Sequence, residues 1–90
     1  MRVALVVNLH RSDAIEAARG AARWLFEHGA VEVVAEEHVA GLLDIKTVSK
    51  EDIAHSNLVI AFGGDGTIIR AAHICSEIGT PILGVHFGRF

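Results

Sequence analysis

The stretch Leu58-Val59-Ile60-Ala61-Phe62, continued by Gly63-Gly64-Asp65-Gly66-Thr67, decides the fold of this chain. A run of apolar residues like the first half is typical of a strand that is buried on both faces of a parallel sheet. A second apolar run, with helical spacing, starts at Ile68, so the glycine-rich segment predicts a turn from strand to helix. Open α/β sheets bind nucleotides and phosphates at such turns, where the first N–H groups of the helix are free. Glycines around one carboxylate favour a binding site here over an ordinary tight turn.

The other elements follow from shorter patterns on both sides of this segment. Apolar runs predict strands over residues 3–7, 31–35, 58–62 and 82–85, and helical spacing predicts helices between Asp13 and Gly29, over 36–44, around Ile53 and over 67–78. Strands that alternate with helices predict βαβ units with right-handed crossovers. We therefore expect residues 1–90 to form a Rossmann-like, three-layer α/β/α domain with a mainly parallel sheet of about four strands.

Several residues are predicted to end these helices or to face the core. Asp13 is the expected N-cap of the first long helix, with Glu16 completing a capping box, and Ser49 with Asp52 is a second capping signal. Gly29 is expected to end the first helix in a left-handed conformation, and Gly79 to end the last helix. The expected buried faces are Ile15, Ala18, Ala22, Leu25 and Phe26 in the first helix and Ile68, Ala71, Ala72 and Cys75 in the last.

Composition narrows the class of protein. The 90 residues are 51% hydrophobic and carry 8 Lys and Arg against 11 Asp and Glu, which excludes a disordered chain and argues against a nucleic-acid partner. No apolar stretch reaches the roughly 18 to 20 residues of a membrane span. The single cysteine, Cys75, is interpreted as a small buried residue and is typical of a reducing compartment, so we expect a cytoplasmic protein. Because the chain stops just after a strand of central type, we expect it to be the N-terminal part of a longer protein.

Asp65 is the candidate catalytic residue. The dipole and free N–H groups at a helix start stabilise its anion, which can accept a proton from a hydroxyl nucleophile or hold Mg²⁺ directly or through water. The segment lacks the Gly-Lys-Ser/Thr ending of a Walker A loop, and Ile69 stands where the dinucleotide fingerprint has its third glycine. Thr67 is either part of a phosphate loop with Gly63 and Gly64 or only a helix cap.

Three further side chains are candidates at the same sheet edge. Arg70 is one turn into the helix, from where it either reaches back towards a phosphate or lies solvated on the helix face. Asn8 follows the first strand and is interpreted mainly as a turn residue, whereas His86 is the only histidine expected near the ligand edge. The other histidines are scattered along the sequence without metal-ligand spacing, which argues against a zinc site.

Two segments of the sequence resemble the motifs of a known family. The segment from Leu58 to Ala72 is similar to the signature of NAD kinases, and Thr80-Pro81-Ile82-Leu83-Gly84-Val85 followed by Gly88-Arg89 is similar to that family's second N-terminal motif. The glycine motif is shared with diacylglycerol and sphingosine-type lipid kinases, but the Ile68-Ile69-Arg70-Ala71-Ala72 context resembles the NAD kinase form.

The resemblance implies an enzyme that transfers the terminal phosphoryl group of ATP, with Mg²⁺ or another divalent cation, or of polyphosphate, to the adenosine 2′-hydroxyl of NAD. It implies that Asp65 is the proton acceptor, that Gly66 lies against the NAD and that Arg70 is a further NAD contact. It also implies a second, mostly β domain beyond these residues, which supplies much of the NAD pocket and most of a homo-oligomer interface. His86 and Phe90 depart from the Asn and Leu that the family often has at these positions.

These residues leave three functions open. The first is an NAD kinase, of which these residues alone have little activity because two substrates must be held from more than one side. The second is a lipid kinase with the same glycine motif, although no basic amphipathic stretch is present. The third is a non-catalytic Rossmann-like nucleotide-binding module, since a fold alone does not determine a function.

Overall fold

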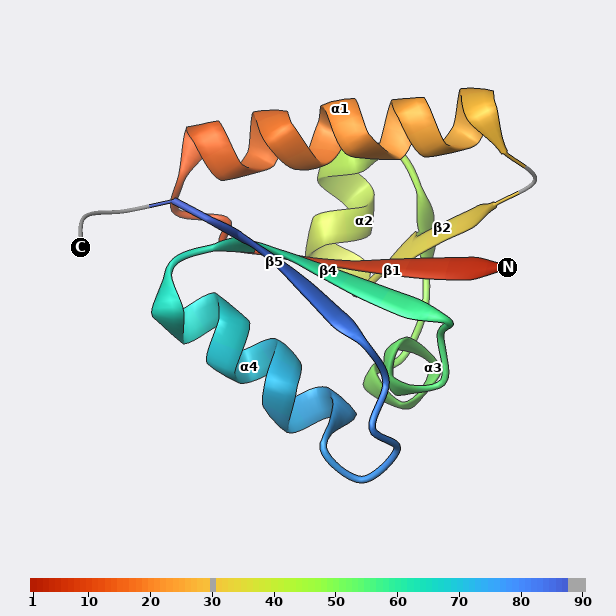
Figure 1. Cartoon of the computed structure of the whole chain (residues 1–90). Coiled ribbons are helices and arrows are strands. Elements are labelled where there is room, and N and C mark those ends of the chain that lie inside the picture. The colour runs from red at the N-terminus through yellow and green to blue at the C-terminus, as the bar shows by residue number, and fades with distance from the viewer. Residues whose placement is uncertain (30, 88–90) are drawn as a thin grey trace.

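Strands and helices alternate along the chain in the computed structural model, which describes residues 1–29 and 31–87 (Figure 1). In order they are β1 (Arg2–Val7), α1 (Ser12–His28), β2 (Glu32–Ala35), α2 (Glu37–Leu43), β3 (Lys46–Thr47), α3 (Lys50–Ala54), β4 (Leu58–Gly63), α4 (Asp65–Cys75) and β5 (Ile82–His86). The predicted α/β class is confirmed. Among these residues, none of the helices combines the length and the apolar character that crossing a bilayer requires.

The sheet is parallel, and its strand order is β3-β2-β1-β4-β5. The chain moves outward from β1 to β2 and β3 and then continues on the other side of β1 with β4 and β5. The side on which successive strands are added therefore changes between β1 and β4. Open α/β sheets bind ligands at such a switch point, outside the carboxyl ends of the strands. The sheet has five strands where about four are expected. The additional strand, β3, consists of the exposed Lys46 and Thr47, so no apolar pattern marks it in the sequence.

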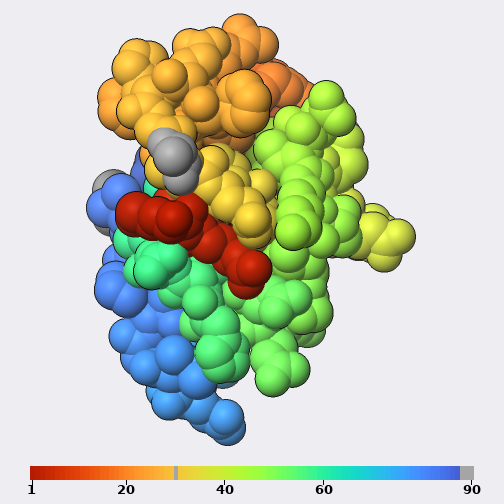
Figure 2. All heavy atoms as spheres, turned by 90° about the vertical axis from the view of Figure 1, so that its right-hand side faces the viewer, coloured from red at the N-terminus to blue at the C-terminus, as the bar shows by residue number. Residues whose placement is uncertain are grey.

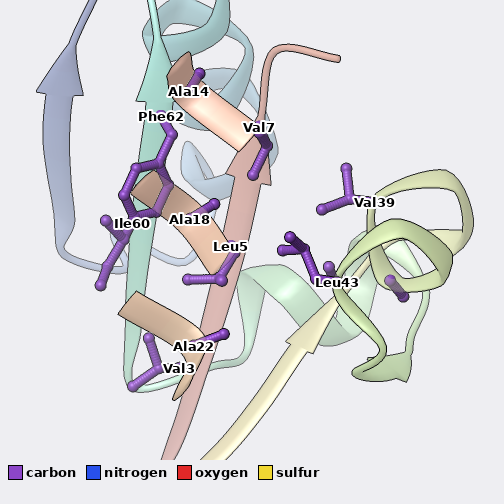
Figure 3. Close-up of a cluster of buried hydrophobic side chains, with 12 residues drawn as sticks. Val3, Leu5, Val7, Ala14, Ala18, Ala22, Val39, Leu43, Ile60 and Phe62 are labelled. Atoms are coloured by element: carbon purple, nitrogen blue, oxygen red, sulfur yellow. The ribbon is translucent and has the colours of Figure 1, made fainter. Parts of the chain in front are cut away.

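Helices cover both faces of the sheet, which gives the three expected layers (Figure 1). Side chains of the central strands alternate between the two faces, because successive residues of a strand point in opposite directions. Leu5 packs in the cluster beneath α1 and α2, while Ala4 and Val6 pack in the cluster formed with α3 and α4. Figure 3 shows the α1 side, where small side chains let the helix lie close to β1 and β4; they are Ala14, Ala18 and Ala22.

The N-terminal end of α1 differs from the expectation. Arg11 is the N-cap residue and no side chain caps the helix, so the capping box predicted for Asp13 and Glu16 is wrong. Asp13 instead accepts a two-pronged hydrogen bond from Arg11, at 2.8 and 3.0 Å, and Glu16 pairs with Arg19. The hydrogen bond from Arg11 holds the pKa of the Asp13 carboxyl below its ordinary value. Asp13 Oδ1 also accepts a hydrogen bond from the Ala14 N–H at 2.8 Å, so Arg11 and the first turn of α1 share this carboxylate.

The C-terminal end of α1 also corrects two predictions. Gly29 has an extended backbone with φ −161°, so the predicted left-handed cap is wrong. Phe26, expected on the buried face, is 79% exposed. The fully buried residues of α1 are all alanines, so its buried stripe is narrower than predicted, and Phe26 borders a hollow instead.

Other helix boundaries are close to the expectation. The Ser49 hydroxyl accepts a hydrogen bond from the Asp52 N–H at 3.2 Å, which confirms this cap of α3. Helix α4 begins at Asp65, earlier than the predicted Thr67, and its regular part ends at Cys75. A turn then leads to Gly79, whose φ of +76° explains the glycine there.

Cys75 and Ala72 lie on opposite sides of α4, one buried and one exposed. Cys75 is 2% exposed, which confirms it as a small buried residue, and burial raises the pKa of its thiol. Ala72, predicted to be buried, is exposed. The covered stripe of α4 runs through Ala71 and Cys75, so Ala72 faces away from the sheet.

Candidate functional site

The glycine-rich segment lies where the structure turns from β4 into α4, at the carboxyl edge of the sheet. Gly63 is the last residue of β4, Gly64 is the N-cap of α4, and Asp65 is the first residue of the helix. The Gly63 carbonyl accepts a hydrogen bond from the Phe87 N–H at 2.8 Å, which attaches the end of β5 to this turn. The predicted strand-turn-helix context of the motif is therefore confirmed.

Gly63 has no room for a side chain. A Cβ atom built there would lie 2.4 Å from Thr67 Oγ1, 2.7 Å from Thr67 Cβ and 3.0 Å from Asn8 Cβ. Thr67 thus folds back over the turn from the first turn of α4, and it is not the N-cap. The glycine is required by close packing within the protein, at a position with a backbone that any residue type can adopt.

Asn8 joins the end of β1 to the same turn. Its N–H donates to the Phe62 carbonyl at 2.9 Å, and its Oδ1 accepts from the His10 N–H at 2.9 Å. The second bond is that of a turn residue, as predicted. Asn8 and the glycine segment therefore lie side by side at the carboxyl ends of the paired strands β1 and β4.

The Asp65 side chain is 89% exposed, and its Oδ1 lies 3.0 Å from His86 Nε2. His86 is the last residue of β5 and is paired with Gly63 in the sheet register. His86 therefore lies at the carboxyl edge of the sheet, where the sequence analysis expects a ligand. Asp65 combines an accessible carboxylate with the start of a helix, an arrangement that suits contact with a hydroxyl group or with a phosphate-bound cation.

Arg70 reaches towards β2. Its guanidinium forms an ion pair with Glu36, the residue that follows β2, and its side chain is 47% exposed. Both residues line a hollow of about 400 Å³ with Val7 and His38, at the carboxyl ends of β1 and β2. His38 therefore also lies near this edge, so the expectation that His86 is the only histidine there is wrong.

The sequence analysis did not name Glu36 as a residue of this edge. Glu36 directly follows the strand predicted over 31–35, and the structure places it at the carboxyl end of β2, next to β1. The same edge rule could have found it.

A second hollow lies away from this edge of the sheet. It measures about 700 Å³ and is bordered by the second half of α1, by the end of α2 and by β2 and β3. Figure 2 looks onto the edge where the strands begin, and the hollow lies there between the orange atoms of α1 and the yellow-green atoms of α2 and β3. Phe26 and Leu42 are exposed at its border. None of the predicted site residues lines it.

No three His, Cys, Asp or Glu side chains within residues 1–29 and 31–87 are grouped so that they could hold a metal ion. Magnesium commonly binds through substrate phosphates, water and one or two carboxylates, without an all-protein cage. The exposed Asp65 carboxylate fits that mode, in which the cation arrives with a nucleotide.

One known protein family matches nearly the whole chain. The profile of the family described as ATP-NAD kinase N-terminal domain matches residues 3–90. The chain belongs to this family. The match includes the whole segment from β4 through α4 to β5, which holds Asp65, Arg70 and His86.

Curated relatives extend well beyond the length of this chain. An NAD kinase of Caldanaerobacter subterraneus is 34% identical over 97% of this chain, and an NAD kinase of Citrifermentans bemidjiense is 35% identical over 97%. An NAD kinase of Moorella thermoacetica is 32% identical, again over 97% of this chain. The chain spans 31%, 32% and 28% of the lengths of these relatives.

Proposed function

We propose that this chain is the nucleotide-binding part of an NAD kinase, which phosphorylates the adenosine 2′-hydroxyl of NAD with ATP, or with polyphosphate, as donor. The observation that carries the proposal is the exposed carboxylate of Asp65, held at the start of α4 within the motif that matches the family. Relatives that align with nearly the whole chain are named NAD kinases, which supports the same reaction.

In the proposed reaction the 2′-hydroxyl oxygen attacks the terminal phosphorus of ATP. The new bond joins that oxygen to phosphorus, and the bond from phosphorus to the bridging oxygen breaks, so that ADP leaves with the electron pair. The hydroxyl proton passes to the Asp65 carboxylate. Positioning and charge stabilisation dominate phosphoryl transfer, so the protein's main task is to align the two substrates.

The remaining site residues have proposed roles around this step. Gly63, Gly64 and Thr67 form the turn that faces the phosphates, with the first N–H groups of α4 directed towards them. Gly66 is proposed to lie against NAD, and nothing lies within 4 Å of a Cβ built there, so its surface is open to a ligand. Arg70 is a proposed further NAD contact, which requires that it share its guanidinium with Glu36 or leave it.

The divalent cation is proposed to arrive with ATP. The phosphates of ATP would provide most of the ligands of the cation, and Asp65 would bind it through water. The cation would neutralise charge at the transferred phosphoryl group.

In this proposal the described residues lie on only one side of the reacting atoms. Two substrates require groups from more than one side, so we propose that the NAD pocket is completed by a second, mostly β domain and that the complete protein is a homo-oligomer. These ninety residues by themselves are then expected to show little or no turnover.

The test is Asp65→Asn in the full-length gene product, assayed with NAD and ATP. Turnover should collapse while the affinity for NAD stays within a few fold, because the amide keeps the shape of the side chain and cannot accept the proton. Glu27→Gln, an exposed carboxylate near the end of α1, is the matched control and should leave both quantities unchanged. Unchanged turnover in Asp65→Asn, or phosphorylation of diacylglycerol in place of NAD, would contradict the proposal.

A further inference from the structure

We propose that His86 is a positioning residue, which holds one oxygen of the Asp65 carboxylate and thereby directs the other towards the substrate hydroxyl. The inference rests on the proposed function, because it takes Asp65 as the proton acceptor. It assigns a task to a side chain in β5, far along the sequence from the glycine motif.

The geometry of the pair supports this task. His86 Nε2 and Asp65 Oδ1 are 3.0 Å apart, within the range of an N–H···O hydrogen bond. The Asp65 side chain is 89% exposed, so solvent surrounds most of it and packing does little to restrict its rotation. A single hydrogen bond from a fixed neighbour can therefore decide the orientation of this carboxylate.

His86 is a suitable fixed neighbour. Its side chain is 22% exposed, and it belongs to a strand that is paired with β4 residue by residue from Ile82 to His86. The register places His86 beside Gly63, and the Phe87 N–H then binds the Gly63 carbonyl. The imidazole is thus attached to the same turn that positions Asp65, and groups on sheet elements are held more accurately than groups on loops.

The hydrogen-bond chemistry limits how His86 can act. An ionised carboxylate only accepts hydrogen bonds, so Nε2 must carry the hydrogen that joins the pair. The other ring nitrogen, Nδ1, is buried and cannot reach a substrate. His86 therefore contacts the reacting groups only through Asp65, and it keeps its proton while the proton of the 2′-hydroxyl moves to Asp65 Oδ2.

The first test is kinetic and uses the full-length gene product. His86→Leu removes the N–H donor, and kcat should fall about tenfold while the KM for NAD stays within about twofold, since a misaligned acceptor slows the chemical step more than it weakens binding. His86→Gln keeps a donor at similar reach and should recover most of the loss. His73→Leu, an exposed histidine on α4, is the control and should match the wild type.

The second test is independent of activity. Long-range proton–nitrogen NMR spectra of the ninety-residue chain at pH 9 should show His86 as the Nε2–H tautomer, with its Nε2 resonance shifted by Asp65→Asn and not by Glu27→Gln. This measurement also covers the case in which His86→Leu does not fold. If the contact is present but Asp65→Asn keeps full turnover, the proposed function is wrong, whereas the geometry of the pair remains.

Three results would overturn the inference itself. The first is an Nδ1–H tautomer of His86, or an Nε2 resonance that ignores Asp65→Asn. The second is a folded His86→Leu variant with wild-type kcat. The third is an equal loss in His86→Leu and His86→Gln, which would indicate a merely structural role.

Discussion

Replacement of Gly63 by alanine should destabilise the chain, although the substitution adds a single methyl group. The new Cβ would lie 2.4 Å from Thr67 Oγ1 and 2.7 Å from Thr67 Cβ, against 3.4 to 4 Å for ordinary contact. Rotation of the threonine side chain moves its Oγ1 but leaves its Cβ in place, so the backbone of the turn must shift. Overpacking of this kind costs about 1–3 kcal/mol. In a domain of this size that corresponds to a fall in Tm of roughly 5–20 °C.

The assay is thermal unfolding of the ninety-residue chain, followed by far-UV circular dichroism, with urea unfolding to obtain the free energy. Gly66→Ala is the matched control, because a Cβ there meets nothing within 4 Å and alanine favours a helix; its stability should rise by up to about 1 kcal/mol. A Gly63→Ala variant that melts within about 2 °C of the wild type would refute the packing argument.

Two further predictions concern the helices. Ile53→Ala should lower the free energy of unfolding by about 2–5 kcal/mol, since Ile53 is fully buried. Phe26→Ala should change this free energy by less than about 0.5 kcal/mol, because Phe26 is exposed. Equal costs of the two substitutions in urea unfolding would contradict the helix faces described above. Because the hydrogen bond from Arg11 lowers the pKa of Asp13, the pair adds stability above the ordinary aspartate pKa of about 3.9, and this contribution is lost as pH falls through the lowered pKa. The urea midpoint of Asp13→Asn should therefore lie below that of the wild type at pH 7 and converge with it in acid, and coincident midpoints at pH 7 would argue against the pairing.

Much of the fold could be predicted because its signals are local. The apolar runs of β1 and β4 are long enough to indicate strands buried on both faces, and the alternation with helices predicts a parallel sheet. The helix start at Ser49 was predictable for the same reason, since a cap involves residues that are neighbours in sequence. Strand β3 was not, because it is short, polar and formed only through pairing with β2.

The errors at the two ends of α1 have different causes, a local contact at its start and the packing of neighbouring elements at its end. Asp13 has the chemistry of an N-cap, but Arg11 binds it in a two-pronged ion pair. Phe26 has the spacing of a core residue, but its side chain is exposed beside a hollow that residues of β2, α2 and β3 also line. Periodicity defines the direction in which a side chain points, and the neighbouring elements define whether anything is there.

The sequence predicted the motif of the candidate site but not the contacts between its side chains. The segment from Gly63 to Thr67 identified the turn, and the edge rule for parallel strands placed Asn8 and His86 beside it. Neither argument states which side chains touch. Arg70 illustrates this limit, because its spacing allowed a contact with the helix start, whereas the structure pairs it with Glu36.

By itself, the sequence determined that a buried strand runs into a glycine turn with a carboxylate at the start of a helix, because these properties depend on residues within one short segment. Only the tertiary structure decided which partners meet there. The contacts of Asp65 with His86 and of Arg70 with Glu36 join residues 21 and 34 positions apart in the sequence. Their distances are fixed by the order β3-β2-β1-β4-β5, which brings the ends of distant strands to one edge. Strand order depends on the packing of the whole chain, and no local pattern encodes it.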